Sequence, residues 1–235
     1  MKAMEKLRHP CFSPEEEYWL KMDPQTVPAS TPLHPDFINN LQRGRYLDVG
    51  CGSGRISGQL RDQGHLVVAI DTNQFELSKG ISTYPNISFV RTIGEQLPFA
   101  ENTFDGALLL GVLGGVGVKE RQRILGDSVR CVRPSGIVYI SEFTRITNPK
   151  TLTSDGRSWV NVYTQDQEQT QENGSVIVHN LDGTTRFVAH HFTEKELRGL
   201  LLSHSIRPSV CKKMDILSTV SNQTRKSITV WGYKS

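Results

Sequence analysis

Three closely spaced glycines at a strand-to-helix junction constrain this sequence more than any other feature. Residues 47–55 read L-D-V-G-C-G-S-G-R, with an apolar segment before them and an amphipathic segment after them. Glycines at such a junction let the backbone turn tightly and approach a ligand with no side chain between them. The amide N–H groups at the start of the following helix favour anionic or polar groups of that ligand. The loop therefore predicts a binding site at the end of a buried strand.

Strands and helices alternate on both sides of this loop. The apolar segments predict strands at 46–50, 66–70, 87–91, 104–110 and 137–142, with helices at 53–63, 73–79 and 119–132 between them. A capping box at Thr193 and Glu196 predicts a helix from 193 to about 204, and strands follow at 207–214 and 227–233. This order predicts an α/β fold, a Rossmann-like seven-stranded and mostly parallel sheet with helices on both faces.

The flanking segments differ from this core. Residues 1–43 predict an N-terminal helical cap or lid, and residues 144–192 a β-rich insertion after the fifth strand. Within that insertion we expect strands at 159–164, 175–179 and 185–189, a loop at 165–174 and a hairpin turn at Asp182-Gly183. The chain is then one domain, 1–235. Its parts are the cap, a cofactor-binding core at 44–143, a substrate-side insertion and a closing segment at 193–235.

Composition narrows the class of protein. The chain has 235 residues and a formal charge of only +3, which suits one domain and argues against dense nucleic-acid binding. The longest apolar run, residues 106–118, is shorter than the roughly 20 residues that a spanning helix needs, so we expect no membrane segment. Residues 1–10 lack the apolar core of a secretion signal. The cysteines (Cys11, Cys51, Cys131, Cys211) lack metal-ligand spacing, which favours free thiols and a cytoplasmic location.

The residues around the loop indicate the cofactor. Asp71 ends the second strand, where its carboxylate could accept both hydroxyls of a ribose, so a nucleoside-containing cofactor is expected. A dinucleotide fingerprint would carry its third glycine at position 55, where this chain has Arg55. Asp48, directly before the loop, would repel a pyrophosphate but suits an amino group. The combination favours S-adenosylmethionine.

Four motifs in order make this sequence similar to a known family. They are L-D-V-G-C-G-S-G at 47–54, A-I-D at 69–71, L-P-F-A-E-N-T-F-D at 97–105 and V-R-P-S-G-I-V-Y-I-S-E-F at 132–143. The chain resembles the class I S-adenosylmethionine-dependent methyltransferases, in particular the group called methyltransferase type 11. The resemblance covers residues 44–143, and the remainder more loosely.

The resemblance implies a set of cofactor contacts. They are Asp48, Gly50, Cys51, Gly52, Gly54, Asp71, Thr72, Ile93, Gly94, Glu95 and Gly111. In this assignment the glycine backbone cradles the methionyl and ribose side, Asp71 holds the ribose and Thr72 lies under the adenine. Gly111 would offer its carbonyl to the methionyl amine, which Asp48 also anchors. One departure is Ile93, where the family often has an Asp that binds the adenine. The backbone of Ile93 and Gly94 could still offer hydrogen bonds, and Glu95 could replace the carboxylate.

Catalytic residues are less constrained. Methyl transfer is an in-line displacement that needs a base only if the nucleophile arrives protonated. Candidates for that base are His191 first and His190 second, which face opposite sides of an expected strand. Tyr18 and Trp19 could close over the cofactor and substrate, or could instead be buried against the core.

Several functions remain open from the sequence. The first is methylation of an O or N atom of a small molecule, with S-adenosylhomocysteine as product. Residues 186–197 (R-F-V-A-H-H-F-T-E-K-E-L) also resemble a stretch of tRNA wobble-uridine methyltransferases, which methylate a carboxylate. A dinucleotide-dependent oxidoreductase and a non-catalytic cofactor-binding protein are alternatives of other classes.

Overall fold

The computed structural model describes residues 32–153, 156–179, 183–217 and 224–235. Tyr18 and Trp19, and most of the expected N-terminal cap, lie outside these residues, as do Cys11 and Asp182. Cys51, Cys131 and Cys211 are free thiols.

Seven strands form one mixed sheet in the order β3-β2-β1-β4-β5-β9-β8. Their bounds are β1 Arg45–Val49, β2 Leu66–Asp71, β3 Ser88–Arg91, β4 Phe104–Leu110, β5 Val132–Phe143, β8 Ile206–Leu217 and β9 Thr224–Lys234. The pairs among β1 to β5 are all parallel, whereas β9 is antiparallel to both β5 and β8. The predicted Rossmann-like, mostly parallel sheet is therefore confirmed.

The sheet is covered on both faces by helices. Their bounds are α2 Pro35–Ile38, α3 Arg55–Asp62, α4 Gln74–Thr83, α5 Val118–Cys131 and α7 Glu194–Ser203, with a short 3-10 turn, η2, at Leu113–Gly115. Local signals explain where α7 begins, because Thr193 and Glu196 form the predicted capping box. The N-cap of α3 is Gly54, so the helix starts directly from the glycine loop.

Alternation along the central strands divides the core into two layers. Leu47 and Val49 of β1 pack in the layer that holds the apolar side chains of α5 and α7. Tyr46 packs in the opposite layer, with Leu60 of α3 and Tyr139 of β5. Strands that are apolar on both faces are typical of parallel sheets covered by helices.

The insertion after β5 differs from its prediction. It contains a helix, α6 Trp159–Thr170, and a two-stranded hairpin, β6 Ser175–His179 and β7 Thr185–His190. The strand expected at 159–164 and most of the loop expected at 165–174 are therefore wrong. The physical reason is the spacing of Trp159, Val162 and Tyr163, which are three and four residues apart and share one helix face in a small apolar cluster.

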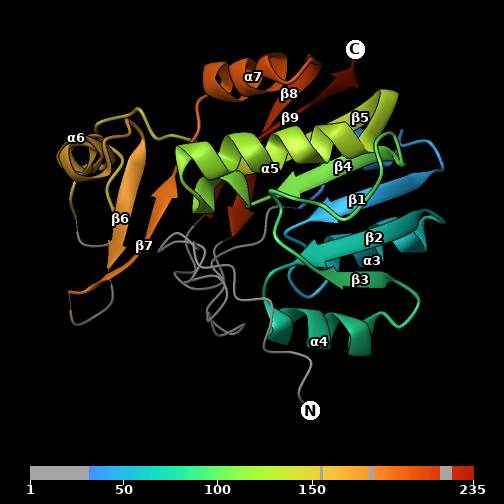
Figure 1. Cartoon of the computed structure of the whole chain (residues 1–235). Coiled ribbons are helices and arrows are strands. Elements are labelled where there is room, and N and C mark those ends of the chain that lie inside the picture. Colours follow the sequence, from blue (N-terminus) through green and yellow to red (C-terminus); the bar gives the residue numbers. More distant parts are fainter. Residues whose placement is uncertain (1–31, 154–155, 180–182, 218–223) are drawn as a thin grey trace.

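The insertion lies on the side of the molecule where the parallel strands have their carboxyl ends. Figure 1 shows the arrowheads of β1 to β4 pointing toward the side that carries α6, β6 and β7. Ligands of open α/β sheets bind at the carboxyl ends of the strands. The insertion is therefore placed beside these carboxyl ends, which we call the ligand edge of the sheet.

Candidate functional site

The glycine loop between β1 and α3 adopts backbone conformations that side chains disfavour. Gly50 has φ +66° and Gly52 has φ +53°. A Cβ at Gly50 would lie 2.4 Å from Cγ2 of Val112, whereas at Gly52 the nearest heavy atom would be 3.7 Å away, on Glu76. The loop therefore packs tightly against the segment after β4 at Gly50 but stays open at Gly52. The Cys51 thiol donates to the Gly52 carbonyl, and burial raises the pKa of this thiol.

Asp71 joins this loop to the end of β2. Its Oδ2 accepts from the amide of Gly52 and its Oδ1 from the amide of Asn73, each at 2.8 Å. Burial raises the pKa of Asp71, and these backbone hydrogen bonds oppose the rise. Since each carboxylate oxygen has a second lone pair, both oxygens keep capacity to accept from a ligand. The structure thus brings the predicted loop and its predicted acidic partner together.

Asp48 lies behind the loop, in the layer between β1 and α3. It is buried and accepts a hydrogen bond of 2.6 Å from the hydroxyl of Ser57. Burial is the largest effect on this carboxyl and raises its pKa to about 6.

The segment after β4 is held by a residue that the sequence analysis missed. Oε1 of Glu142, near the end of β5, accepts from the amides of Val112 at 3.0 Å and Leu113 at 2.7 Å. Burial raises the pKa of Glu142 to about 7. Just before this segment, Gly111 is exposed with φ +69°, and its amide donates to the carbonyl of Ser141 at 2.8 Å. A carboxylate shortly after the apolar run at residues 137–140, near the end of the expected strand, was the signal that could have identified Glu142.

The segment after β3 contains the remaining predicted cofactor contacts. The Thr92 amide donates to the Asp71 carbonyl at 3.1 Å, which ties the end of β3 to the end of β2. Gly94 packs near Ile124 of α5, because an added Cβ would lie 3.1 Å from that side chain. Oε2 of Glu95 lies 3.6 Å from Nη1 of Arg123. Thr72 and Ile93 are half-buried.

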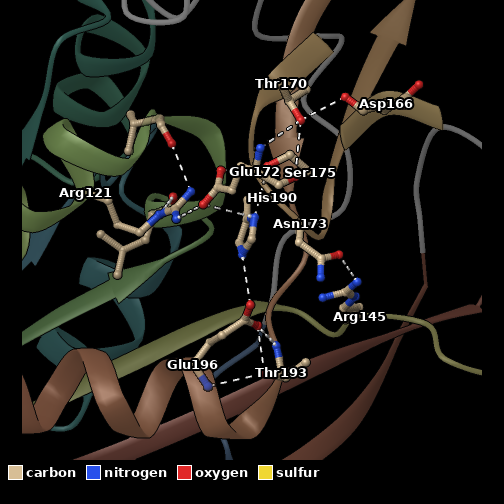
Figure 2. A network of polar contacts seen from close by, with 12 residues as sticks. Arg121, Arg145, Asp166, Thr170, Glu172, Asn173, Ser175, His190, Thr193 and Glu196 are labelled. Carbon is tan, nitrogen blue, oxygen red and sulfur yellow. Dashed lines mark hydrogen bonds and ion pairs between the residues drawn. The ribbon is translucent and has the colours of Figure 1, made fainter. Parts of the chain in front are cut away.

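His190 belongs to a polar network that joins α5, the hairpin and α7 (Figure 2). Its Nδ1 lies 3.0 Å from the hydroxyl of Ser175 and 3.4 Å from Oε1 of Glu172, and its Nε2 lies 4.0 Å from Oε1 of Glu196. Arg121 donates to the same Glu172 oxygen at 2.6 Å. The network thus joins Arg121 of α5, residues 172–175 before and at the start of β6, and Glu196 of α7, which are far apart in the sequence, so spacing alone could not have indicated it.

Arg121 also holds the segment after β4. Its Nε donates to the Leu113 carbonyl at 2.8 Å and its Nη2 to the Val116 carbonyl at 3.1 Å, while its guanidinium lies over the ring of Phe192. The side chain is only 6% exposed. One arginine thus fixes the β4 segment and the insertion relative to each other.

His191 lies in a separate, aromatic cluster. Its Nδ1 is 2.7 Å from the hydroxyl of Tyr163 on α6, and its ring is 5.4 Å from that of Trp159 and 5.8 Å from that of Phe143. Burial lowers the pKa of His191 to about 3, and the charges of Arg225, His190 and Arg145 act in the same direction. The two histidines therefore face different surroundings, although both are buried.

Known proteins resemble this chain in both sequence and structure. Residues 47–140 match the family model described as a methyltransferase domain. The structure resembles the crystal structure of a SAM-dependent methyltransferase from Methanosarcina mazei, with a TM-score of 0.78 and 28% identity, over 87% of this chain and 99% of that chain. Residues 47–140 of this chain therefore form a methyltransferase domain.

Two relatives of this methyltransferase domain have names that refer to quinones. Demethylmenaquinone methyltransferase from Renibacterium salmoninarum is 32% identical over 112 residues, 48% of this chain and 46% of the relative. Ubiquinone biosynthesis O-methyltransferase from Hahella chejuensis is 29% identical over 160 residues, 65% of this chain and 63% of the relative. The matches thus span about half of the first relative and less than two thirds of the second.

A more distant structure shares the fold of the methyltransferase domain. It is 1,6-didemethyltoxoflavin-N1-methyltransferase from Burkholderia thailandensis, with a TM-score of 0.56 and 21% identity, over 81% of this chain and 72% of that chain. The family match ends at residue 140, so Tyr163, His190 and His191 lie outside it. Among the helices that the structure describes, none is long and apolar enough to cross a membrane.

Proposed function

We propose that this chain is an S-adenosylmethionine-dependent methyltransferase that acts on an O or N atom of a small molecule. The observation that carries the proposal is the open glycine loop, with the Asp71 carboxylate hydrogen-bonded to the amide of Gly52. The methyltransferase-domain match over residues 47–140 supports it.

The loop has room for the cofactor. An added Cβ at Gly52 would meet no atom closer than 3.7 Å, and one at Gly111 would meet nothing within 4 Å. At both positions the positive φ leaves backbone atoms uncovered by a side chain. A ligand can therefore approach the backbone from the ends of β1 and β4.

The proposed contacts follow from this placement. Asp71 would accept from the ribose hydroxyls, and Asp48, through the loop, would favour the methionyl amine. The backbone of Gly50, Cys51, Gly52 and Gly54 would line the methionyl side, and Gly111 would offer its carbonyl. Thr72, Ile93, Gly94 and Glu95 would surround the adenine. In this proposal residues 44–143 are the cofactor-binding part of one domain, and 144–192 build the substrate side.

Methyl transfer requires little of the protein beyond placing the acceptor next to the cofactor. S-adenosylmethionine, when bound, supplies an activated methyl group on a sulfonium. The chain's own residues then align the acceptor with that methyl group and exclude water, which supports a large rate enhancement without a catalytic dyad. The prediction that His191 or His190 acts as a general base stays a prediction.

The substrate class is inferred from the relatives. Two of them are named for demethylmenaquinone and ubiquinone biosynthesis, and a structural neighbour binds 1,6-didemethyltoxoflavin. All three names point to small cyclic compounds. We therefore propose flat ring compounds as the first methyl acceptors to test.

Binding of S-adenosylhomocysteine tests the cofactor assignment directly. Isothermal titration calorimetry on the wild-type chain should show binding, and Asp71→Asn should weaken it at least about tenfold, because a hydrogen bond to a charged group is worth about 1.5–3 kcal/mol. Asp62→Asn is the matched control, since Asp62 lies exposed on α3 and pairs only with its neighbour Arg61 among the described residues. No wild-type binding, or equal binding by both variants, would contradict the proposal.

A further inference from the structure

Arg225, near the start of β9, is a half-buried cation held against aromatic rings. Its Cζ lies 5.6 Å from the ring centre of Trp159 and 5.9 Å from that of Phe143. Burial lowers the pKa of Arg225. Within the part of the chain that the structure describes, no Asp or Glu carboxylate forms an ion pair with this guanidinium.

Arg145, just after β5, flanks the same cluster from another side. Its Cζ lies 5.4 Å from the ring centre of Tyr163, and its Nη2 donates to the side-chain oxygen of Asn173. Among the described residues its partner is thus a neutral amide and not a carboxylate. Figure 2 shows Arg145 and Asn173 beside the His190 network. Two guanidinium groups therefore lie against one aromatic cluster, and neither forms an ion pair with a carboxylate among the described residues.

His191 contributes a neutral donor to this cluster. The oxygen of Tyr163 already accepts from the amide of Ile146 at 3.3 Å, so its O–H is best used by donating to Nδ1 of His191, 2.7 Å away. Burial raises the pKa of Tyr163 to about 12, which keeps this donor protonated at neutral pH. A neutral imidazole that accepts at Nδ1 carries its proton on Nε2. Within the described residues no hydrogen bond is made by Nε2.

The cluster lies at the ligand edge of the sheet. Phe143 is the last residue of β5, and it shares a face with Tyr139, four residues earlier, which packs in the α3 layer. Asp48 faces the same layer through Ser57 of α3. The arginines are therefore on the side of the sheet that also carries Asp48, one of the proposed cofactor contacts.

Partly desolvated cations without counter-ions are costly, and an anionic ligand removes that cost. Guanidinium groups bind carboxylates and other oxyanions through paired hydrogen bonds. Aromatic rings beside them offer flat apolar contact. The arrangement thus matches a flat ligand with one anionic oxygen group.

We propose that Arg145, Arg225 and His191 form a recognition site for the anionic oxygen of a flat ring compound, which is the methyl acceptor. This inference rests on the proposed methyltransferase function and makes the acceptor a ring carboxylate or an acidic ring hydroxyl. Its oxygen lone pair forms the new O–C bond as the S–C bond breaks, and the S–C electron pair stays on sulfur. One negative and one positive charge disappear and no proton moves, so His191 acts as a donor and not as a base.

Salicylate and salicylamide form a matched pair of probes, because they differ mainly in the charge of one group. We expect the full chain, with S-adenosylhomocysteine added, to bind salicylate at least about tenfold more tightly than salicylamide in calorimetry, as for a charged hydrogen bond. Arg225→Met and Arg145→Met should each reduce this preference severalfold. Arg207→Met, at an exposed position near the other end of the β8–β9 pair, should keep it.

Thermal unfolding of each variant separates loss of the site from loss of the fold. A wild-type chain that binds both probes equally would overturn the proposal, as would a folded Arg225→Met, Arg145→Met double variant that keeps the full preference. Binding of S-adenosylhomocysteine without any salicylate preference would refute this inference and leave the proposed function standing. Salicylate preference without S-adenosylhomocysteine binding would support the anion site and refute the proposed function.

Discussion

The carboxyl of Asp48 on β1 accepts a 2.6 Å hydrogen bond from the hydroxyl of Ser57 on α3, with both side chains almost fully buried. The pair links the strand before the glycine loop to the helix after it. Burial nevertheless dominates over this hydrogen bond and raises the pKa of Asp48 to about 6. The loop is therefore built on a carboxyl group whose charge is costly in the folded chain.

Asp48 should make the stability of the chain depend on pH. Because its pKa is raised on folding, its contribution to stability is fully present below about pH 4 and is lost as pH rises through about 6. The loss should be about 3 kcal/mol, at ~1.4 kcal/mol for each pH unit. Urea unfolding between pH 4 and 7.5 should show this decline in the wild type and a smaller one in Asp48→Asn. Parallel pH profiles for the two chains would contradict the prediction.

Two glycines at the ligand edge should differ in their tolerance of alanine. Gly50→Ala forces a Cβ to 2.4 Å from Val112, in addition to a positive φ, whereas Gly111→Ala meets only the positive φ. The conformational strain alone costs about 1–2 kcal/mol. We expect Gly111→Ala to lose about that much unfolding free energy and Gly50→Ala clearly more, as measured by urea unfolding. Equal losses of unfolding free energy would show that the Val112 side chain can move aside at no energetic cost.

Arg121 should be far more important for stability than its helix neighbour Arg123. Arg121→Met removes the guanidinium that donates to the carbonyls of Leu113 and Val116 and to Oε1 of Glu172. Removing one partner of a buried ion pair costs about 3 kcal/mol. Arg123→Met is the control, because its side chain is 62% exposed and such pairs contribute about 0–1 kcal/mol. Similar melting temperatures for the two variants would argue against the network as a structural link.

His191 should remain neutral well below pH 6. Its pKa is lowered in the folded chain by burial and by Arg225, His190 and Arg145, so its contribution to stability is present above pH 6.5 and is lost as pH falls toward about 3. Nitrogen-15 NMR of the imidazole should show a single neutral tautomer, protonated at Nε2, from pH 5 to 8. The His191→Gln variant lacks this imidazole, so the signal that is missing from its spectrum belongs to His191.

Tyr163→Phe tests what fixes that tautomer. Without the phenol O–H, Nδ1 of His191 loses its donor, and we expect the NMR signal to shift toward a mixture of tautomers. The Ile146 amide also loses its acceptor, at a cost of about 1–3 kcal/mol if no water replaces it. Trp159→Phe keeps the phenol and should leave the tautomer unchanged. A wild-type tautomer protonated at Nδ1 would refute the hydrogen-bond assignment.

The parallel core could be predicted because its signals are local. Buried strands such as β1 and β4 are short apolar runs, and the glycine loop with Asp71 defines the ligand edge by sequence distance alone. The capping box of α7 was equally local, and the structure contains it. These features depend on a few neighbouring residues, which a sequence displays directly.

The substrate side could not be predicted in the same way. Helix α6 begins with apolar residues whose spacing fits a helix face but also a short strand, and in the structure Trp159 and Tyr163 of this helix pack against His191. Likewise, no spacing indicates that Arg225 lies near His191. Contacts of this kind follow from tertiary arrangement and not from local preference.

The antiparallel direction of β9 has a consequence for specificity. It brings the first residues of the last strand, and not its end, to the edge where β5 finishes, with Ser227 opposite Phe143. Because side chains alternate along a strand, a one-residue slip of the β8–β9 hairpin would turn Arg225 to the opposite face. Under our proposal, the register of β9 against β5 would thus change which acceptors are selected while leaving the proposed cofactor contacts intact.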